Sequence, residues 1–204
     1  MTTHDHRFVE LEGAFNFRDL GGLPTGDGGT TRFGVMFRSD ALHHLQPTDV
    51  ERLMELGMRT VIDLRSSVEL ERTETLTAII TQLAGVGNLP AVFHCTAGKD
   101  RTGMVAALVL SLVGVDDEVI VEDYTLTDER MVLVMERIRA EGDFPEPLAP
   151  VAANVARAEA SSMETFLGAL ARTHGGAHGW ARAAGLDDDV LDGLHEVLVE
   201  SPPA

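Results

Sequence analysis

Apolar residues recur along this chain with two different spacings, which predict strands in some segments and helices in others. Short runs rich in apolar and β-branched residues, bounded by glycine, proline or polar residues, predict buried strands at 35–40, 60–65 and 91–93. Apolar residues spaced three and four positions apart predict helices at 47–56, 73–83, 102–113, 116–140, 161–174 and 187–198.

The order of these segments predicts an α/β fold. A short strand near 16–22 and the strand at 35–40 flank a glycine-rich turn at 24–29, which indicates a hairpin. Strands and helices then alternate, and a crossover through the helix at 73–83 makes the strands on either side of it parallel. We therefore expect a single domain of residues 1–204, with a small, mainly parallel sheet between helices and a helical part from about residue 141.

Sequence signals at the helix ends refine this prediction. Ser or Thr followed three residues later by Glu predicts capping boxes from Thr48 to Glu51 and from Ser161 to Glu164. Gly57 and Gly114 are typical of helix ends. Three prolines at 144–150 predict a break, and the weak packing pattern between residues 125 and 160 indicates the place for a mobile lid.

Composition argues against several classes of function. Sixteen basic and 33 acidic residues give a formal net charge of −17, which disfavours binding to nucleic acid or to an anionic membrane. The N-terminal residues lack the apolar stretch of a signal peptide, and no apolar run reaches the roughly 20 residues of a membrane span. The single cysteine fits a reducing compartment. We expect a cytoplasmic protein, with export that needs no signal peptide as the open alternative.

That cysteine lies in the most informative stretch of the chain, Val92-Phe93-His94-Cys95-Thr96-Ala97-Gly98-Lys99-Asp100-Arg101-Thr102-Gly103. A predicted strand precedes Cys95, a predicted helix follows, and five residues separate Cys95 from Arg101. A loop of this length can direct its N–H groups toward one point at the helix N-terminus, where orphan amides and the helix dipole favour a phosphate dianion. The same positive field favours the nucleophilic thiolate of Cys95.

Other side chains in and near this loop supply the remaining parts of a phosphoryl transfer. The Arg101 guanidinium can hold two phosphoryl oxygens and stabilise their charge in the transition state. Asp100, at the rim of the loop, is the first candidate for the acid that protonates the leaving group. Asp63, at the carboxyl end of a predicted strand, is the second candidate, or a carboxylate that orients the loop. The loop residues expected to bind phosphate are Thr96, Ala97, Gly98 and Lys99.

These residues resemble the cysteine-based protein tyrosine phosphatases, whose signature is His-Cys, five residues, Arg, and then Ser or Thr. Three further runs resemble the bacterial branch of that family: Asn16-Phe17-Arg18-Asp19-Leu20-Gly21-Gly22, Phe37-Arg38-Ser39 and Asp63-Leu64-Arg65-Ser66. The resemblance implies hydrolysis of a phosphate monoester through a phosphocysteine, with inorganic phosphate as product. We expect no metal or other cofactor, because Arg101 and the loop amides supply the charge stabilisation.

The resemblance implies phosphorylated protein as the substrate, mainly phosphotyrosine. Phosphoserine, phosphothreonine and phosphoinositides are additional candidates, since Lys99 adds a second cation to the loop; the competing interpretation is that Lys99 only compensates local acidic charge. Arg18 and Arg38 either contact substrate or fix loops, or they pair with Asp19 or Asp40.

The segment at 69–89 is shorter than in this branch, which leaves the substrate-facing wall undefined. Two other classes remain as alternatives: a catalytically silent phosphate-binding module, and a sulfur-transfer or arsenate-reducing enzyme that also places a cysteine in an anion loop.

Overall fold

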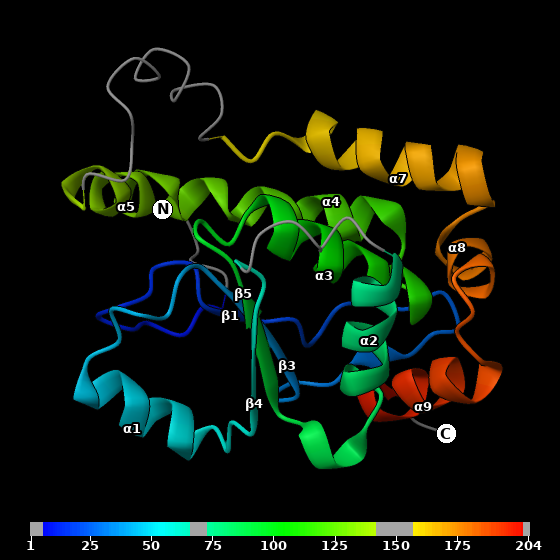
Figure 1. The fold of residues 1–204 in the computed structure, drawn as a ribbon, viewed down its shortest axis with the longest axis horizontal. Coiled ribbons are helices and arrows are strands. Elements are labelled where there is room, and N and C mark those ends of the chain that lie inside the picture. Colours follow the sequence, from blue (N-terminus) through cyan, green and yellow to red (C-terminus); the bar gives the residue numbers. More distant parts are fainter. Residues whose placement is uncertain (1–5, 66–72, 142–156, 202–204) are drawn as a thin grey trace.

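A four-stranded sheet lies at the centre of the structure, a computed structural model that describes residues 6–65, 73–141 and 157–201 (Figure 1). The strand order is β1 (Arg18–Asp19), β3 (Met36–Ser39), β5 (Ala91–His94) and β4 (Thr60–Asp63). Strands β3, β5 and β4 are parallel and β1 is antiparallel to β3. The predicted α/β class with a small, mainly parallel sheet is therefore confirmed.

Helices make up most of the remaining described chain. They are α1 (Pro47–Glu55), α2 (Thr73–Leu83), α3 (Asp100–Leu112), α4 (Asp117–Leu126), α5 (Asp128–Ala140), α7 (Ala160–His174), α8 (Ala177–Ala183) and α9 (Asp188–Leu198), with a short 3₁₀ turn, η2 (Val86–Asn88). Figure 1 shows α7 along the top of the molecule, α8 at the right and α9 at the bottom right. The predicted helical C-terminal part is present in the described residues.

Alternation along the strands divides the core into two parts. Met36, Ala91 and Phe93 point into the larger cluster, which also contains apolar side chains of α2, α3, α4, α7, α8 and α9. Phe37 and Val92, their neighbours in sequence, point to the opposite face and pack with α1. Because successive side chains of a strand face opposite sides of the sheet, the consecutive apolar residues Ala91 to Phe93 of β5 bury side chains on both faces, and helices cover both faces of the sheet, as predicted.

The helix α3 carries its apolar residues on nearly every side and is buried over most of its length. It packs between the sheet and α4, and the ring of Tyr124 from α4 comes so close to Gly103 that a Cβ there would lie 2.9 Å from the ring. Tyr124 is thus part of the core packing. The close approach fixes the first turn of α3, which follows the predicted phosphate loop.

Several boundaries differ from the sequence predictions. The capping residue of α1 is Gln46, and its capping box uses Asp49, so the predicted Thr48–Glu51 box is wrong. Helix α7 begins at Ala160 with Glu159 as its cap, so the Ser161–Glu164 box is also wrong. In both cases the residue with extended backbone that caps the helix lies two positions before the predicted Thr or Ser cap.

Two very short strands were not predicted. β2 (Thr30–Thr31) and β6 (Val199–Glu200) pair antiparallel and tie the C-terminal end to the hairpin region. The proline-rich break at 144–150 lies outside the described residues, as does the part of the predicted lid at 142–156. Residues 128–140 of that segment form α5, which buries Met131, Val134, Met135 and Ile138. No described helix combines the length and apolar character that a membrane span requires.

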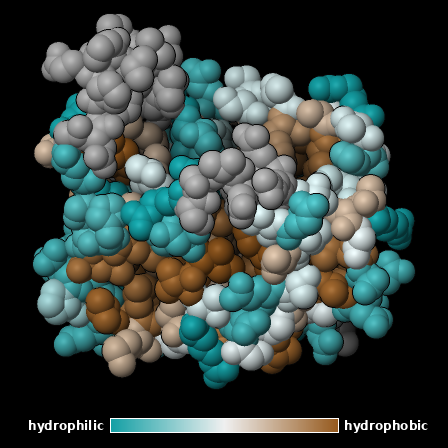
Figure 2. Space-filling view, in the orientation of Figure 1, coloured by the Kyte–Doolittle hydropathy of each residue, from teal (hydrophilic) through white to brown (hydrophobic). Residues whose placement is uncertain are grey.

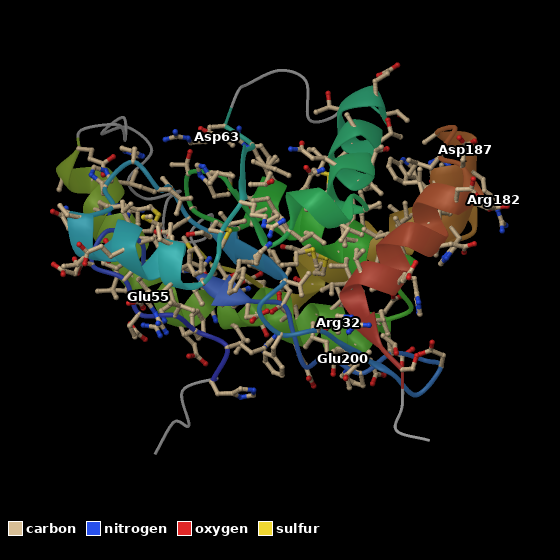
Figure 3. All side chains as sticks on the ribbon, turned by 90° about the horizontal axis from the view of Figure 1, so that it is seen from below. Arg32, Glu55, Asp63, Arg182, Asp187 and Glu200 are labelled. Carbon is tan, nitrogen blue, oxygen red and sulfur yellow. The ribbon has the colours of Figure 1, made fainter. Side chains whose placement is uncertain are left out.

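The surface carries one broad apolar area in the region of α1 and β4 (Figure 2). Exposed hydrophobic side chains of these elements are Val50, Met54 and Val61. β4 lies at one edge of the sheet, next to β5, in the described part of the chain. The ion pair of Arg32 with Glu200 lies far from Asp63, which is at the end of β4 (Figure 3).

Candidate active site

Cys95 follows directly on the central strand β5, and the helix α3 begins five residues later at Asp100. The strand, loop and helix predicted for this stretch are thus present. The cysteine is buried, with 4% of its surface exposed. The residues expected to bind phosphate, Thr96 to Lys99, lie at the N-terminus of α3, where unpaired amides and the helix dipole attract anions.

The loop is held against the end of β3. Gly98 adopts a left-handed conformation with φ of 67°, and a Cβ at this position would lie 2.7 Å from the backbone of Ser39 and Asp40. Only glycine satisfies both the backbone conformation and the close approach. The Ala41 N–H donates to the Thr96 carbonyl at 3.2 Å, which fixes the start of the loop.

Arg101 lies one residue into α3, with its side chain directed at the end of β4. Its Nη1 donates to the Leu64 carbonyl at 2.8 Å, so the guanidinium bridges the carboxyl ends of two neighbouring strands. No other partner of this guanidinium occurs among the residues that the structure describes. Its remaining N–H groups are available for two phosphoryl oxygens.

Lys99 and Asp100 contact each other at the rim. The Asp100 carboxylate is exposed, with 73% of its side chain accessible, and lies 3.2 Å from Lys99 Nζ. The Lys99 side chain is 9% exposed and also donates to the Arg157 carbonyl at 3.3 Å. In this arrangement the ammonium group compensates an acidic neighbour, which is the second of the two interpretations of Lys99.

Asp63 lies at the carboxyl end of β4, beside the residue that precedes the cysteine. Its Oδ1 is 3.9 Å from His94 Nε2, and its carboxylate accepts hydrogen bonds from the Arg65 guanidinium at 2.8 to 3.1 Å. The hydrogen bond from Arg65 lowers the pKa of Asp63 to about 2, although partial burial opposes the shift. Burial lowers the pKa of His94, which favours a neutral ring at neutral pH.

Arg65 is a site residue that sequence reasoning did not single out. Its hydrogen bonds with Asp63 raise the pKa of Arg65, although partial burial opposes the shift. The Nη1 atom of Arg65 also lies 2.9 Å from Nδ1 of His43. One sequence feature could have identified Arg65: it follows Asp63 by two residues, at the end of a strand that was predicted to lie beside the ligand site.

The two arginines of the N-terminal hairpin pair with Asp123 of α4, not with Asp19 or Asp40. Arg38 Nη1 is 2.7 Å from Asp123 Oδ2, and Arg18 Nε is 3.2 Å from Oδ1. All three side chains are buried. The expected pairing was wrong because residues next to these arginines in sequence face other directions, whereas α4 brings a carboxylate from more than 80 positions away.

A second carboxylate, Asp40, was also assigned the wrong partner. It accepts hydrogen bonds from the backbone N–H groups of Phe15 and Asn16 and from the guanidinium of Arg137. Arg38 fixes a loop, as one interpretation proposed, because its Nη2 donates to the Gly98 carbonyl at 2.9 Å.

The hydroxyl of Thr102 is buried and has no hydrogen-bond partner in the described part of the chain.

One group of side chains has the composition of a metal site. His43, His44 and Glu141 bring possible ligand atoms within 4.8 Å of one another. Two arginines flank the group: Arg65 contacts His43, and Arg137 Nε lies 3.7 Å from Glu141. Burial, followed by the charges of His44 and Arg65, lowers the pKa of His43. Positive neighbours on two sides oppose binding of a cation here.

Comparison with known proteins adds independent information. A family model described as "Tyrosine phosphatase family" matches residues 9–78 and 70–200. The "Triple specificity protein phosphatase PtpB" of Mycobacterium tuberculosis is 26% identical over 277 residues, covering 93% of this chain and 98% of that protein. A "Tyrosine-protein phosphatase" of Nostoc commune is 30% identical over 127 residues, covering 57% of this chain and 41% of that protein.

These alignments also bear on the short segment after β4. The alignment with the mycobacterial protein is longer than the 204 residues of this chain, so that relative contains internal sequence with no counterpart here. The two parts of the family match overlap at residues 70–78. This overlap lies inside the 69–89 segment, which the sequence analysis described as shorter than in the bacterial branch. Because the matches together span residues 9–200, with the whole cysteine loop included, the chain belongs to the tyrosine phosphatase family.

Proposed function

We propose that this protein is a cysteine-dependent phosphatase that removes phosphate from phosphotyrosine in proteins. The observation that carries the proposal is the position of Cys95 at the carboxyl end of the central strand, with Arg101 in the first turn of the helix that follows. Membership in the tyrosine phosphatase family supports the same reaction. We assign the role of nucleophile to Cys95, that of acid and base to Asp100, and that of stabilising the phosphoryl charge to Arg101.

The reaction proceeds in two steps. In the first, the Cys95 thiolate forms a bond to phosphorus while the bond to the leaving oxygen breaks, and Asp100 protonates that oxygen. In the second, water attacks the phosphocysteine, Asp100 accepts a proton from the water, and inorganic phosphate and the thiolate are released. Throughout, Arg101 and the N–H groups of the loop from Thr96 to Lys99 stabilise the charge on the three equatorial oxygens.

The choice between Asp100 and Asp63 as the acid follows from their surroundings. The Arg65 guanidinium binds the Asp63 carboxylate and lowers its pKa to about 2, which disfavours Asp63 as a proton donor. We assign it instead to holding Arg65 beside the site. Asp100 lies at the exposed rim, where the leaving group of a bound substrate would be.

Leaving-group dependence tests this assignment. General acid catalysis contributes roughly 10²- to 10⁴-fold when the leaving group needs a proton. Asp100→Asn should therefore lower kcat strongly with phenyl phosphate and weakly with 4-nitrophenyl phosphate, whose leaving group is stable as an anion. Asp63→Asn should lower both equally. The reverse pattern would assign the acid to Asp63.

Substrate range is the next part of the proposal. The mycobacterial relative is named for triple specificity, which supports phosphoserine and phosphothreonine as further substrates. A phosphoinositide would need the Lys99 ammonium for its second phosphate, and that group now contacts Asp100 and the Arg157 carbonyl. Lys99→Ala should lower activity on a phosphoinositide more than on a phosphotyrosine peptide; equal losses on both would remove phosphoinositides from the substrate list.

The decisive experiment measures phosphate release by the wild type and by Cys95→Ser, with EDTA present. The substrates are an aryl phosphate, a phosphotyrosine peptide and a phosphoinositide. We expect turnover that EDTA leaves intact and Cys95→Ser abolishes. Folded wild-type protein that releases no phosphate from any of the three would instead identify a silent phosphate-binding module.

We further propose that the protein acts in a reducing compartment such as the cytoplasm, where its single cysteine stays a thiol.

A further inference from the structure

Three consecutive carbonyl groups of the phosphate loop accept hydrogen bonds from residues outside the loop. The Thr96 carbonyl accepts from the Ala41 N–H at 3.2 Å. The Ala97 carbonyl accepts from Asn16 Nδ2 at 3.4 Å. The Gly98 carbonyl accepts from the same amide at 3.4 Å and from Arg38 Nη2 at 2.9 Å. Donors from outside thus direct all three oxygens away from the interior of the loop.

The geometry of the peptide bond determines what this does to the amides. In a trans peptide, the carbonyl of one residue and the N–H of the next point in opposite directions. Carbonyls of Ala97 and Gly98 that face outward therefore turn the N–H groups of Gly98 and Lys99 inward, toward the space at the N-terminus of α3. Within the described ranges, the N–H groups of Ala97 and Gly98 have no hydrogen-bond acceptor, although Gly98 is buried.

A buried network holds the two outside donors in place. Asn16 Oδ1 accepts a hydrogen bond from Arg18 Nη1, and the Asn16 N–H donates to Asp40 at 2.9 Å. Arg18 and Arg38 both bind the Asp123 carboxylate, which is 1% exposed. Each donor side chain therefore has its orientation fixed by a second contact, with Arg18 of β1 for Asn16 and with Asp123 of α4 for Arg38.

We propose that Asn16 and Arg38 are positioning residues that turn the amide groups of the loop toward the bound phosphate, and that Asp123 fixes them through Arg18 and Arg38. The inference rests on the proposed function, because it takes a phosphate oxyanion as the ligand. It assigns roles to four buried residues outside the signature stretch: Asn16, Arg18, Arg38 and Asp123. It also explains the orientation of the amide donors, which the stretch around Cys95 cannot set by itself.

The charge balance of the network supports the same role. Three buried guanidiniums, of Arg7, Arg18 and Arg38, share the Asp123 carboxylate. The other acceptors of Arg18 and Arg38 are neutral: carbonyls, a hydroxyl and an amide oxygen. An excess of positive charge therefore lies directly behind Gly98. In a chain with a net charge of −17, such a local excess attracts an anion to the loop.

Asn16→Asp is the most informative test, because it changes one atom and keeps the shape of the side chain. The new oxygen would face the Ala97 and Gly98 carbonyls in place of the N–H donor and repel them. The contact with Arg18 would become charge-assisted and stronger. We expect the affinity for tungstate, a phosphate analogue, to fall about 10- to 100-fold, as the loss of one or two hydrogen bonds to a charged ligand predicts. The melting temperature should be unchanged or higher.

Arg38 gives a second, independent test. Arg38→Lys keeps the charge but cannot bind Asp123 and Gly98 together with one planar fork, and Arg38→Met loses both contacts. We expect kcat/KM and tungstate affinity to fall in both variants, more in Arg38→Met than in Arg38→Lys. Arg52→Met is the matched control, since Arg52 is exposed on α1 and pairs only with Glu55 among the described residues; it should change neither quantity.

Calorimetric titration with tungstate and steady-state kinetics on an aryl phosphate distinguish the outcomes. Folded Asn16→Asp and Arg38→Met variants with tungstate affinity within twofold of wild type would overturn the inference, whatever their melting temperatures. A lower melting temperature with normal tungstate affinity would mean a merely structural role. Absence of turnover by the wild type counts only against the proposed function, because tungstate binding reports the loop without any chemistry.

Discussion

The Asp123 carboxylate provides a direct test of how strongly the buried network supports the fold. It accepts hydrogen bonds from Arg38 Nη1 at 2.7 Å, Arg7 Nη1 at 3.0 Å and Arg18 Nε at 3.2 Å. Asp123→Asn removes the negative charge with almost no change in volume. Arg18 and Arg38 would then repel each other in the interior without a counter-charge.

The expected cost is large. Breaking a buried ion pair by removing one partner costs about 3–5 kcal/mol, because a desolvated charge remains. Burial, followed by repulsion from Arg38, already lowers the pKa of Arg18 to about 10 in the presence of Asp123. We expect a loss of about 3–5 kcal/mol in the free energy of unfolding, or roughly 6–20 °C in Tm for a chain of this size.

The pH dependence gives this prediction a definite sign. Burial opposes ionisation of Asp123, but the positive charges of Arg18, Arg38 and Arg7 together hold its pKa far below the usual range. A carboxyl group with a lowered pKa in the folded state stabilises the fold above its unfolded pKa, about 3.9, and the contribution is lost as the pH falls further. The difference in stability between wild type and Asp123→Asn should therefore be constant above about pH 5 and shrink below about pH 4.

Urea unfolding followed by Trp180 fluorescence provides the assay, because this single tryptophan is buried in the main core. Asp192→Asn, on the exposed side of α9, is the control and should change the free energy of unfolding by less than about 0.5 kcal/mol. A loss below about 1 kcal/mol for Asp123→Asn, or a loss that stays the same down to pH 3, would refute the account of the network.

Three further predictions address the loop and its neighbours. Gly98→Ala should reduce kcat/KM on an aryl phosphate by about 100-fold or more, since a Cβ would lie 2.7 Å from the Ser39–Asp40 backbone; near-normal activity would contradict the loop geometry. Gly103→Ala should lower stability by about 1–3 kcal/mol through its contact with the Tyr124 ring, measured by urea unfolding, whereas an unchanged midpoint would count against that packing. Asp63→Asn should leave both limbs of the pH profile of kcat/KM in place, because the pKa of Asp63 is about 2; a lost limb would identify Asp63 as the acid.

Much of the fold was predictable from the sequence because it depends on local patterns. The bounds of α2 agree with the predicted helix at 73–83, and β5 is one residue longer than its prediction. Three consecutive apolar residues in β5, Ala91 to Phe93, indicate a strand covered on both faces, which is how parallel sheets are built. The caps were less predictable, since Gln46 and Glu159 cap helices whose following Ser and Thr residues carried the usual signal.

The cysteine loop was predictable for a similar reason: nucleophile, glycine and arginine lie within seven consecutive residues. The partners of Arg18 and Arg38 were not. Nothing in the local sequence indicates that Asp123, in the middle of an amphipathic helix, faces the sheet and binds two arginines from a distant hairpin. Contacts across more than 80 residues depend on how helices pack, and a single sequence carries no direct signal for that.

The acidic composition of the chain poses a physical problem that the buried network solves. A net charge of −17 repels phosphorylated substrates at long range, but salt screens exposed charges beyond about 8 Å at physiological ionic strength. Buried charges are screened much less, so the guanidiniums of Arg18 and Arg38 behind Gly98 act on a bound anion more strongly than the distant surface carboxylates do. Substrate affinity should consequently depend on salt through the surface charge, whereas the loss caused by Arg38→Met should remain at high salt. A defect in Arg38→Met that disappears at 1 M salt would show that the network acts only as surface charge does.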